Sequence, residues 1–133
     1  MKPVDRLAIR FTAPDSAAPS TFARILFGEE PTRPHDFRVP LRQLGPAPCA
    51  ELWTCPGPHD FHDGDGLQVA QSQDHCLVYA SIDERGASLR SLSREIYDAM
   101  LTGDRLGEYP HIVKAWNYIA EINDGQEDEE RYK

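Results

Sequence analysis

The 133-residue chain lacks a long apolar run and has little cysteine. No stretch approaches the roughly 20 apolar residues that a membrane-spanning helix needs. The first eleven residues also lack the apolar core of a signal peptide. The three cysteines, Cys49, Cys55 and Cys76, are odd in number and form no C-x-x-C pair, so neither a disulfide framework nor a structural zinc site is indicated. We therefore predict a cytoplasmic protein with reduced thiols and no membrane partner.

Basic residues are scarce relative to acidic ones. Lys and Arg number 14 against 22 Asp and Glu, which gives a net charge of -8. Binding to nucleic acid requires clustered cations, so this excess of acid argues against a nucleic-acid partner. Much of the acidity lies between positions 124 and 130. We interpret that run as the solvated start of a helix, and an acidic tail that binds a partner is the alternative.

The composition is that of a globular protein, with 40% hydrophobic and 27% charged residues, and the length indicates one domain over residues 1–133. The first two thirds of the chain contain apolar runs separated by turns rich in Pro and Gly. We predict strands over residues 4–12, 21–28, 37–44 and 50–55, and a hairpin over 67–83 that turns around 72–74. Pro40 limits its strand to a sheet edge, and residues 56–66 are predicted as a long loop.

A helix is predicted next, after Ser88 and before Gly103. Apolar side chains recur there at three- and four-residue steps and form one stripe, which consists of Leu89, Leu92, Ile96 and Met100. The Ser88 hydroxyl can accept a hydrogen bond from the first turn, and Gly103 suits a helix stop.

The apolar run from His111 to Ile122 fits either a helix or a strand. Its β-branched and aromatic residues, Pro110 before it and the turn residues 123–125 after it favour a strand. A strand there gives a strand–helix–strand order. The chain is then expected to have an α+β fold, with a mixed sheet backed by helices.

Potential metal ligands crowd the segment HDFHDGDG. His59, Asp60, His62, Asp63 and Asp65 are the imidazole and carboxylate donors that zinc and iron sites use. The segment lacks an H-E-x-x-H pattern and the spacing of a calcium loop, whereas its glycines and flanking prolines are typical of an exposed turn. We therefore predict no metal, and a metal-dependent hydrolase that uses His59 and His62 is an alternative.

The residues show no arrangement typical of a nucleophile. His75 and Cys76 are adjacent, and neighbours on a strand point to opposite faces, so they cannot pair with each other. Cys76 is interpreted as a small buried side chain. The G-x-S-x-G, P-loop and G-x-G-x-x-G patterns are absent from the sequence. The residues alone thus indicate an α+β domain without an evident catalytic group.

The segment from His111 to Lys133 resembles a signature of the chorismatase family, which includes chorismate hydrolases, 3-hydroxybenzoate synthases and pteridine-dependent dioxygenase-like proteins. The matching residues are His111, Trp116, Asn117, Tyr118, Ile122, Asn123, Glu130, Arg131, Tyr132 and Lys133. Residues 74–83, DHCLVYASID, also resemble the strand before the family's first helix. The resemblance covers roughly the second half of the chain.

This resemblance implies a YjgF-like fold of two modules, each a sheet backed by helices, in a much longer chain. Residues 1–133 are then expected to be a truncated N-terminal domain that is cut within its second helix. The catalytic acid is expected beyond Lys133. The implied reaction of secondary metabolism is the hydrolysis of chorismate with release of pyruvate, and it needs no cofactor.

Among the residues present, the resemblance implies that Tyr132 contacts the substrate, with an Arg seven residues further on. Packing of Tyr132 against the helix is the alternative. Trp116 and Tyr118 are expected to pack rather than to bind. For the whole chain, the alternative is a non-catalytic YjgF-like module that binds a small molecule or a protein. The oligomeric state stays open.

Overall fold

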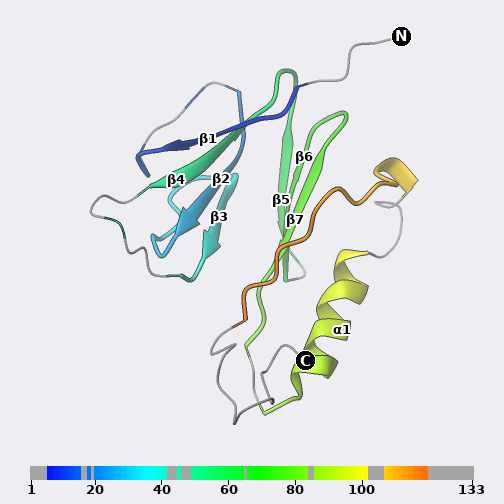
Figure 1. Ribbon diagram of the computed structural model, residues 1–133. Helices are drawn as coiled ribbons and strands as arrows, with labels where there is room; N and C mark the ends of the chain where they lie inside the picture. Colours follow the sequence, from blue (N-terminus) through cyan, green and yellow to red (C-terminus); the bar gives the residue numbers. More distant parts are fainter. Residues whose placement is uncertain are drawn as a thin grey trace. The chain divides into compact units, whose positions relative to one another are not determined.

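The computed structural model describes residues 6–15, 18, 20–41, 45, 49–64, 66–83, 86–101 and 107–119 (Figure 1). The chain divides into two compact units, Met1–Ser81 and Ile82–Lys133. The first unit contains two sheets and the second contains helix α1, so strands and helix are segregated along the chain. This segregation confirms the α+β class. None of the described helices is long and apolar enough to cross a membrane.

The first sheet is mixed. Its described strands are ordered β1 (Ala8–Thr12), β4 (Ala50–Thr54), β2 (Thr21–Phe27) and β3 (Asp36–Val39). β4 pairs antiparallel with β1 and with β2, whereas β2 and β3 run parallel. All four coincide with predicted strands. β3 lies at the edge and ends just before Pro40, in agreement with the edge position that a proline without an N–H allows.

The parallel strands β2 and β3 are joined by residues 28–35, which form no helix. Parallel strands commonly need a crossover of roughly a dozen residues or more, so this link is short. It begins at Gly28, whose φ of +78° is one that glycine adopts without strain. A link this short can follow few backbone paths between the two strands. We therefore expect specific side-chain contacts to fix its path.

The second sheet is an antiparallel meander of β5 (Asp60–Gly64), β6 (Leu67–Gln71) and β7 (Cys76–Ala80). The predicted hairpin over 67–83 is confirmed by β6 and β7. The predicted loop over 56–66 is wrong in its second half, because β5 occupies it. Gly64 pairs with Leu67, so only the sequence Asp-Gly connects β5 to β6, and that dipeptide is a strong hairpin signal. β5 is an edge strand with mostly exposed side chains, so its polar side chains stay solvated and lower the stability of the fold little.

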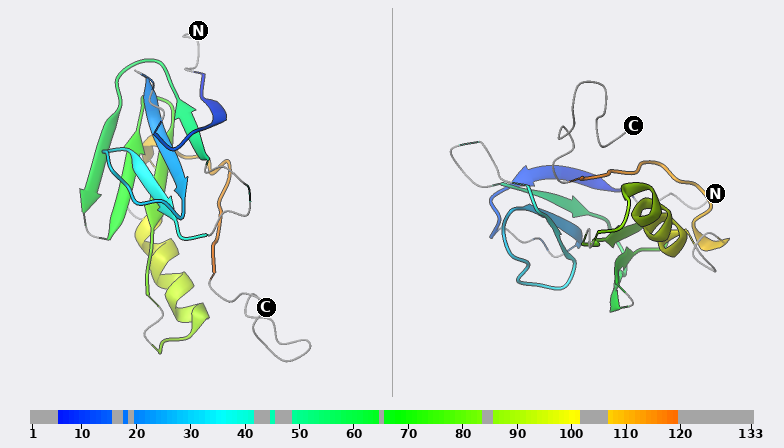
Figure 2. Two further views of the ribbon diagram at one scale, coloured as in Figure 1. Left: turned by 90° about the vertical axis from the view of Figure 1, so that its left-hand side faces the viewer. Right: turned by 90° about the horizontal axis from the view of Figure 1, so that it is seen from below.

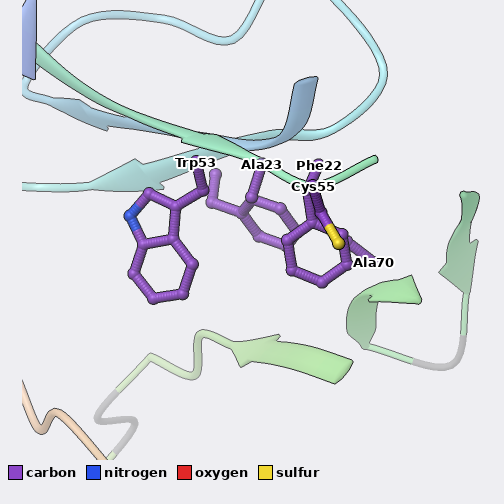
Figure 3. Packing of buried hydrophobic residues seen from close by; sticks show 6 residues of the cluster. Phe22, Ala23, Trp53, Cys55 and Ala70 are labelled. Carbon is purple, nitrogen blue, oxygen red and sulfur yellow. The ribbon is translucent and has the colours of Figure 1, made fainter. Parts of the chain in front are cut away.

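The core of the first unit joins the two sheets. Its buried cluster consists of Phe22, Ala23, Phe37, Trp53, Cys55 and Ala70. Figure 3 shows the Trp53, Ala23 and Phe22 side chains pointing away from the first sheet and toward the strands of the second. Tyr79 on β7 adds a polar link, because its hydroxyl donates to the main-chain carbonyl of Arg38 on β3.

The second unit contains α1 (Leu89–Met100), which confirms the predicted helix. The Ser88 hydroxyl accepts from the Ser91 N–H at 3.2 Å, as a helix N-cap does. The apolar stripe is the less exposed side of the helix, and Leu92 is its buried member. At the other end the Leu101 N–H donates to the Tyr97 carbonyl at 2.9 Å. The predicted stop, Gly103, lies outside the described residues.

Residues 111–119 form neither a helix nor a strand. The prediction of a strand over 111–122 is therefore wrong for these nine residues, and 120–122 lie outside the described residues. Figures 1 and 2 show the segment as a drawn-out trace (orange) rather than a coil. The pattern of a strand is present, but none of the seven described strands pairs with it. A strand is defined by its ladder, so pattern alone does not make one.

Gly28→Ala and Gly66→Ala form a matched pair of tests. Both glycines have positive φ, +78° and +76°, where an alanine is strained by about 1–2 kcal/mol. A Cβ at Gly28 would lie 3.0 Å from the Leu41 carbonyl oxygen, whereas one at Gly66 meets nothing within 4 Å. We expect urea unfolding to show the larger loss of stability for Gly28→Ala. Equal losses would mean that the Leu41 backbone moves aside without cost.

Candidate functional site

The first unit contains a buried ion pair between Arg24 on β2 and Asp36 on β3. The pair is bidentate: Arg24 Nε lies 2.8 Å from Asp36 Oδ1, and Nη2 lies 2.7 Å from Oδ2. The two side chains are 3% and 2% exposed. The two residues are also direct partners in the β2–β3 ladder. Sequence analysis missed the pair, and the one available signal was an Arg inside the apolar strand TFARILF.

The same two side chains fix the short link between β2 and β3. Asp36 Oδ2 also accepts from the N–H groups of Thr32 and Arg33, at 2.9 and 3.0 Å. Arg24 donates to the Thr32 hydroxyl at 3.2 Å and to the Pro14 carbonyl. Both charges are thus compensated inside the protein. The pair organises the fold and presents no group to a reactant.

Hydrogen bonding determines the charge state of the pair. Burial alone raises the pKa of Asp36, but the hydrogen bonds from Arg24, Thr32 and Arg33 outweigh burial and hold this pKa below its ordinary value. The hydrogen bond to Asp36 likewise raises the pKa of Arg24 above its ordinary value, against the effect of burial. Both groups therefore stay ionised at neutral pH.

The structure does not gather the histidines that the metal hypothesis requires. His59 Nε2 donates to the Cys55 carbonyl at 2.5 Å, whereas His62 lies on β5 with its side chain exposed. Within the described ranges, no three His, Cys, Asp or Glu side chains are arranged to hold a metal ion. Asp65 lies outside these ranges. His59 and His62 therefore have no third described ligand with which to form a metal-dependent hydrolase site.

His59 belongs instead to an aromatic cluster at the margin of the core. Its ring centroid lies 6.2 Å from that of His35 and 6.1 Å from that of Phe22. The His35 ring centroid lies 5.2 Å from that of Phe61, with the rings tilted by 37°, and His35 Nδ1 donates to the Phe22 carbonyl at 2.8 Å. Each histidine thus donates one ring N–H to a main-chain carbonyl. Their contacts are those of packing residues.

A Cys–His contact is present, but between residues that sequence analysis did not connect. His75 Nδ1 lies 4.0 Å from the sulfur of Cys55, which is twenty positions earlier in the chain. Cys55 is completely buried, so its thiol cannot reach a dissolved substrate. The arrangement therefore ties the β6–β7 hairpin to the core and does not make a nucleophile. That His75 and Cys76 do not pair with each other stays a prediction; β7 begins at Cys76, so His75 lies just before the strand.

The signature segment keeps its aromatic side chains partly in solvent. Trp116 is 45% exposed and Tyr118 is 47% exposed, and the expectation that they pack rather than bind stays a prediction. Asn117 Oδ1 accepts from the Tyr97 hydroxyl at 2.7 Å, which ties the segment to α1 within the second unit. Tyr132 lies outside the described residues, and its contact with substrate stays a prediction.

Comparison with known proteins identifies relatives of this chain by sequence. The family model described as "Chorismatase FkbO/Hyg5-like, N-terminal" matches residues 51–133. A chorismatase from Streptomyces rapamycinicus is 32% identical over 77 residues, which cover 56% of this chain and 22% of that protein. The match thus spans less than a quarter of the length of this curated relative. No solved structure matches the chain.

Removal of one partner from the buried pair is expected to be costly. Arg24→Met leaves the Asp36 carboxylate without its counter-ion, and such a loss costs about 3–5 kcal/mol of unfolding free energy. The control is Glu30→Gln, which breaks the exposed 3.5 Å contact with Arg38 and should cost at most about 1 kcal/mol. Urea unfolding measures both, and Arg24→Met combined with Asp36→Leu should recover part of the loss. A cost for Arg24→Met no greater than the control's would contradict the role of the pair.

The lowered pKa of Asp36 makes stability fall in acid. A carboxyl group whose pKa is lower in the folded state stabilises the fold above the unfolded-state pKa, and this contribution is lost as pH falls through the folded-state pKa. The loss should therefore occur below pH 3.8, the ordinary Asp value. NMR titration of the Asp36 carboxyl carbon should give a midpoint below that value. A midpoint at or above it would mean that burial outweighs the hydrogen bonds.

Proposed function

The chain belongs to the FkbO/Hyg5-like family of chorismatase N-terminal domains, and we propose that it forms the N-terminal part of an enzyme that hydrolyses chorismate with release of pyruvate. The observation that carries this proposal is the family match over residues 51–133. The identity of 32% to a protein named chorismatase supports it from a separate comparison. The small molecule chorismate is then the substrate.

The proposed enzyme has two YjgF-like modules, of which residues 1–133 supply the first. Mixed and antiparallel sheets in the first unit, followed by α1 in the second, are compatible with a module in which helices back a sheet. The catalytic acid belongs to the part of the enzyme outside this chain. Among the described residues, the buried charged side chains are Arg24 and Asp36, and these two neutralise each other.

The proposed chemistry begins with protonation of the enolpyruvyl group of chorismate by a buried carboxylic acid. The ether bond then breaks after water addition, which gives a dihydroxycyclohexadiene carboxylate, or through intramolecular rearrangement, which gives a hydroxybenzoate. Pyruvate leaves in both cases. No cofactor is required, because no electrons are exchanged with a second molecule.

Tyr132 is the residue of this chain that we assign to substrate binding. Chorismate carries two carboxylates and the chain carries a net charge of -8, so binding depends on local donors rather than on the overall field. A phenol hydroxyl that donates to a carboxylate forms a charge-assisted hydrogen bond. Arg131 and Lys133 flank Tyr132 in the sequence and provide positive charge beside it.

The proposal is tested by pyruvate release from chorismate. The 133-residue chain alone should be inactive, and the chain joined to the remaining part of the Streptomyces rapamycinicus chorismatase should be active. In that longer protein Tyr132→Phe should lower kcat/KM by roughly ten- to a hundredfold, because a hydrogen bond to a charged group contributes about 1.5–3 kcal/mol. Its Tm should stay unchanged, since the ring remains.

Tyr97→Phe is the matched control. It removes a tyrosine hydroxyl that donates to Asn117 and has no assigned role in binding, so kcat/KM should not change. A Tyr132→Phe protein with lowered Tm and normal kinetics would make Tyr132 a packing residue. Turnover by the 133-residue chain at the rate of the longer protein would place the active site within this chain and overturn the two-module proposal.

A further inference from the structure

β1 lies outside the cover that buries its neighbour in the first sheet. It forms an edge of that sheet and pairs with β4, the next strand (Figure 1). Leu52 and Trp53 on β4 are 0% and 7% exposed, and as neighbours on a strand they point to opposite faces. Their partners in the ladder are Arg10 and Ile9, and both of these are exposed. On both faces, therefore, the covered part of the sheet ends between β4 and β1.

One face of β1 continues the apolar face that forms the core. Directly opposite residues of an antiparallel pair point to the same face, so Ile9 shares the face of Trp53, whose side chain belongs to the core cluster. Leu7 precedes Ile9 by two positions and packs against that cluster. Further along the strand, Ile9 is 50% exposed and Phe11 is 72% exposed. The apolar row thus runs from a covered position to two open ones.

The exposed apolar pair is not what a protected sheet edge carries. Proteins commonly protect such edges with short strands, charged side chains or proline. β1 is short and contains Arg10, but it also presents the two large side chains of Ile9 and Phe11 on one face. Among the described strands, β4 is the one that pairs with β1. The outer main-chain edge and an open apolar face thus lie together, and these are the two features that strand addition to a sheet uses.

The charges at this edge specify which kind of strand fits it. Residues 6–12 contain Arg6 and Arg10 and no Asp or Glu. Neither arginine forms an ion pair with a residue that the structure describes. A second copy of β1 would bring two more arginines to the same edge, and like charges on neighbouring strands are unfavourable. The strand that fits has an Asp or Glu opposite Arg10 and apolar residues opposite Ile9 and Phe11.

We propose that β1 pairs, in the longer enzyme, with a strand of this kind from the part of the chorismatase that lies outside this chain. This inference rests on the proposed function, in which the chain is an N-terminal portion. The match with the Streptomyces rapamycinicus protein covers 22% of that protein, so most of it lies outside the matched stretch. A part that is linked covalently to the chain is also present at high effective concentration. The added strand extends the first sheet and covers Ile9 and Phe11.

Hydrogen exchange of the β1 amides, read by mass spectrometry, tests the pairing. Every second residue of an edge strand points its N–H away from the neighbouring strand, so about half of the amides over residues 8–12 should exchange rapidly in the 133-residue chain. In the chain joined to the remaining part of the Streptomyces rapamycinicus chorismatase, these amides should exchange at least about tenfold more slowly. The remaining part is also added as a separate polypeptide, so that the test does not depend on folding of the joined chain. Pyruvate release from chorismate is measured on the same samples.

Phe11→Ser and Arg10→Glu separate the apolar contact from the charge. Both side chains are exposed in the chain alone, so its Tm should not change. In the longer protein each variant should return the β1 amides to the exchange rate of the chain alone, because Phe11→Ser removes the apolar contact and Arg10→Glu places two carboxylates opposite each other. Leu41→Ser is the control. Leu41 is 47% exposed and follows β3 at the opposite edge of the same sheet, so this variant should leave the protection of β1 unchanged.

The outcomes separate this inference from the proposed function. Protection that requires the remaining part, and that both β1 variants remove, supports the pairing even if no pyruvate is released, in which case the proposed function fails by itself. Protection already present in the chain alone would overturn the inference in favour of pairing within the chain, or with a second copy if protection rises with concentration. Amides of β1 that stay unprotected with both the joined and the separate form of the remaining part would also overturn it. Protection that survives Arg10→Glu would overturn the acidic character of the added strand.

Discussion

The bidentate contact between Arg24 and Asp36 is the constraint on which the first unit depends. β2 and β3 run parallel, although only residues 28–35 connect them. One carboxylate binds the guanidinium and two N–H groups of the link, so a single side chain fixes both the strand register and the loop path. Because the pair is buried, removing either side chain would leave the other as an uncompensated charge inside the protein, which destabilises the fold. The sheet that supports the core is therefore maintained by one polar contact as well as by apolar packing.

Local patterns explain how much of the fold could be predicted. Alternation located β1, β2, β4 and the β6–β7 hairpin, and the apolar stripe after Ser88 located α1. β5 was missed because His, Asp and Gly indicate a loop, although its exposed edge position tolerates them and its Asp-Gly turn was readable. Contacts between distant residues could not be predicted. Arg24 and Asp36, and Cys55 and His75, are brought together only by the sheets.

The segment 111–119 was assigned as a strand from its composition, and the described structure shows why composition was insufficient. Strand propensity largely measures fit to a pleated surface with neighbours on it. In this segment, with which none of the described strands pairs, Val113 is almost fully in solvent. The candidate site likewise combines a sequence pattern that could be recognised and contacts that could not be predicted. The family signature was readable in the sequence, whereas the contacts that would make Tyr132 a binding residue depend on parts of the protein outside the described residues.

The geometry of the β2–β3 link also bears on how distant relatives can be recognised. The family match begins at residue 51, after β1, β2 and β3. Arg24 and Asp36 are twelve positions apart and both belong to the ladder, so a residue inserted into or deleted from β2 after Arg24 would move one of them out of register. The link that follows is held by the hydrogen bonds from Thr32 and Arg33 to Asp36. An Arg in an apolar strand, a glycine that ends that strand and an Asp at this spacing define a pattern that can be sought in other sequences.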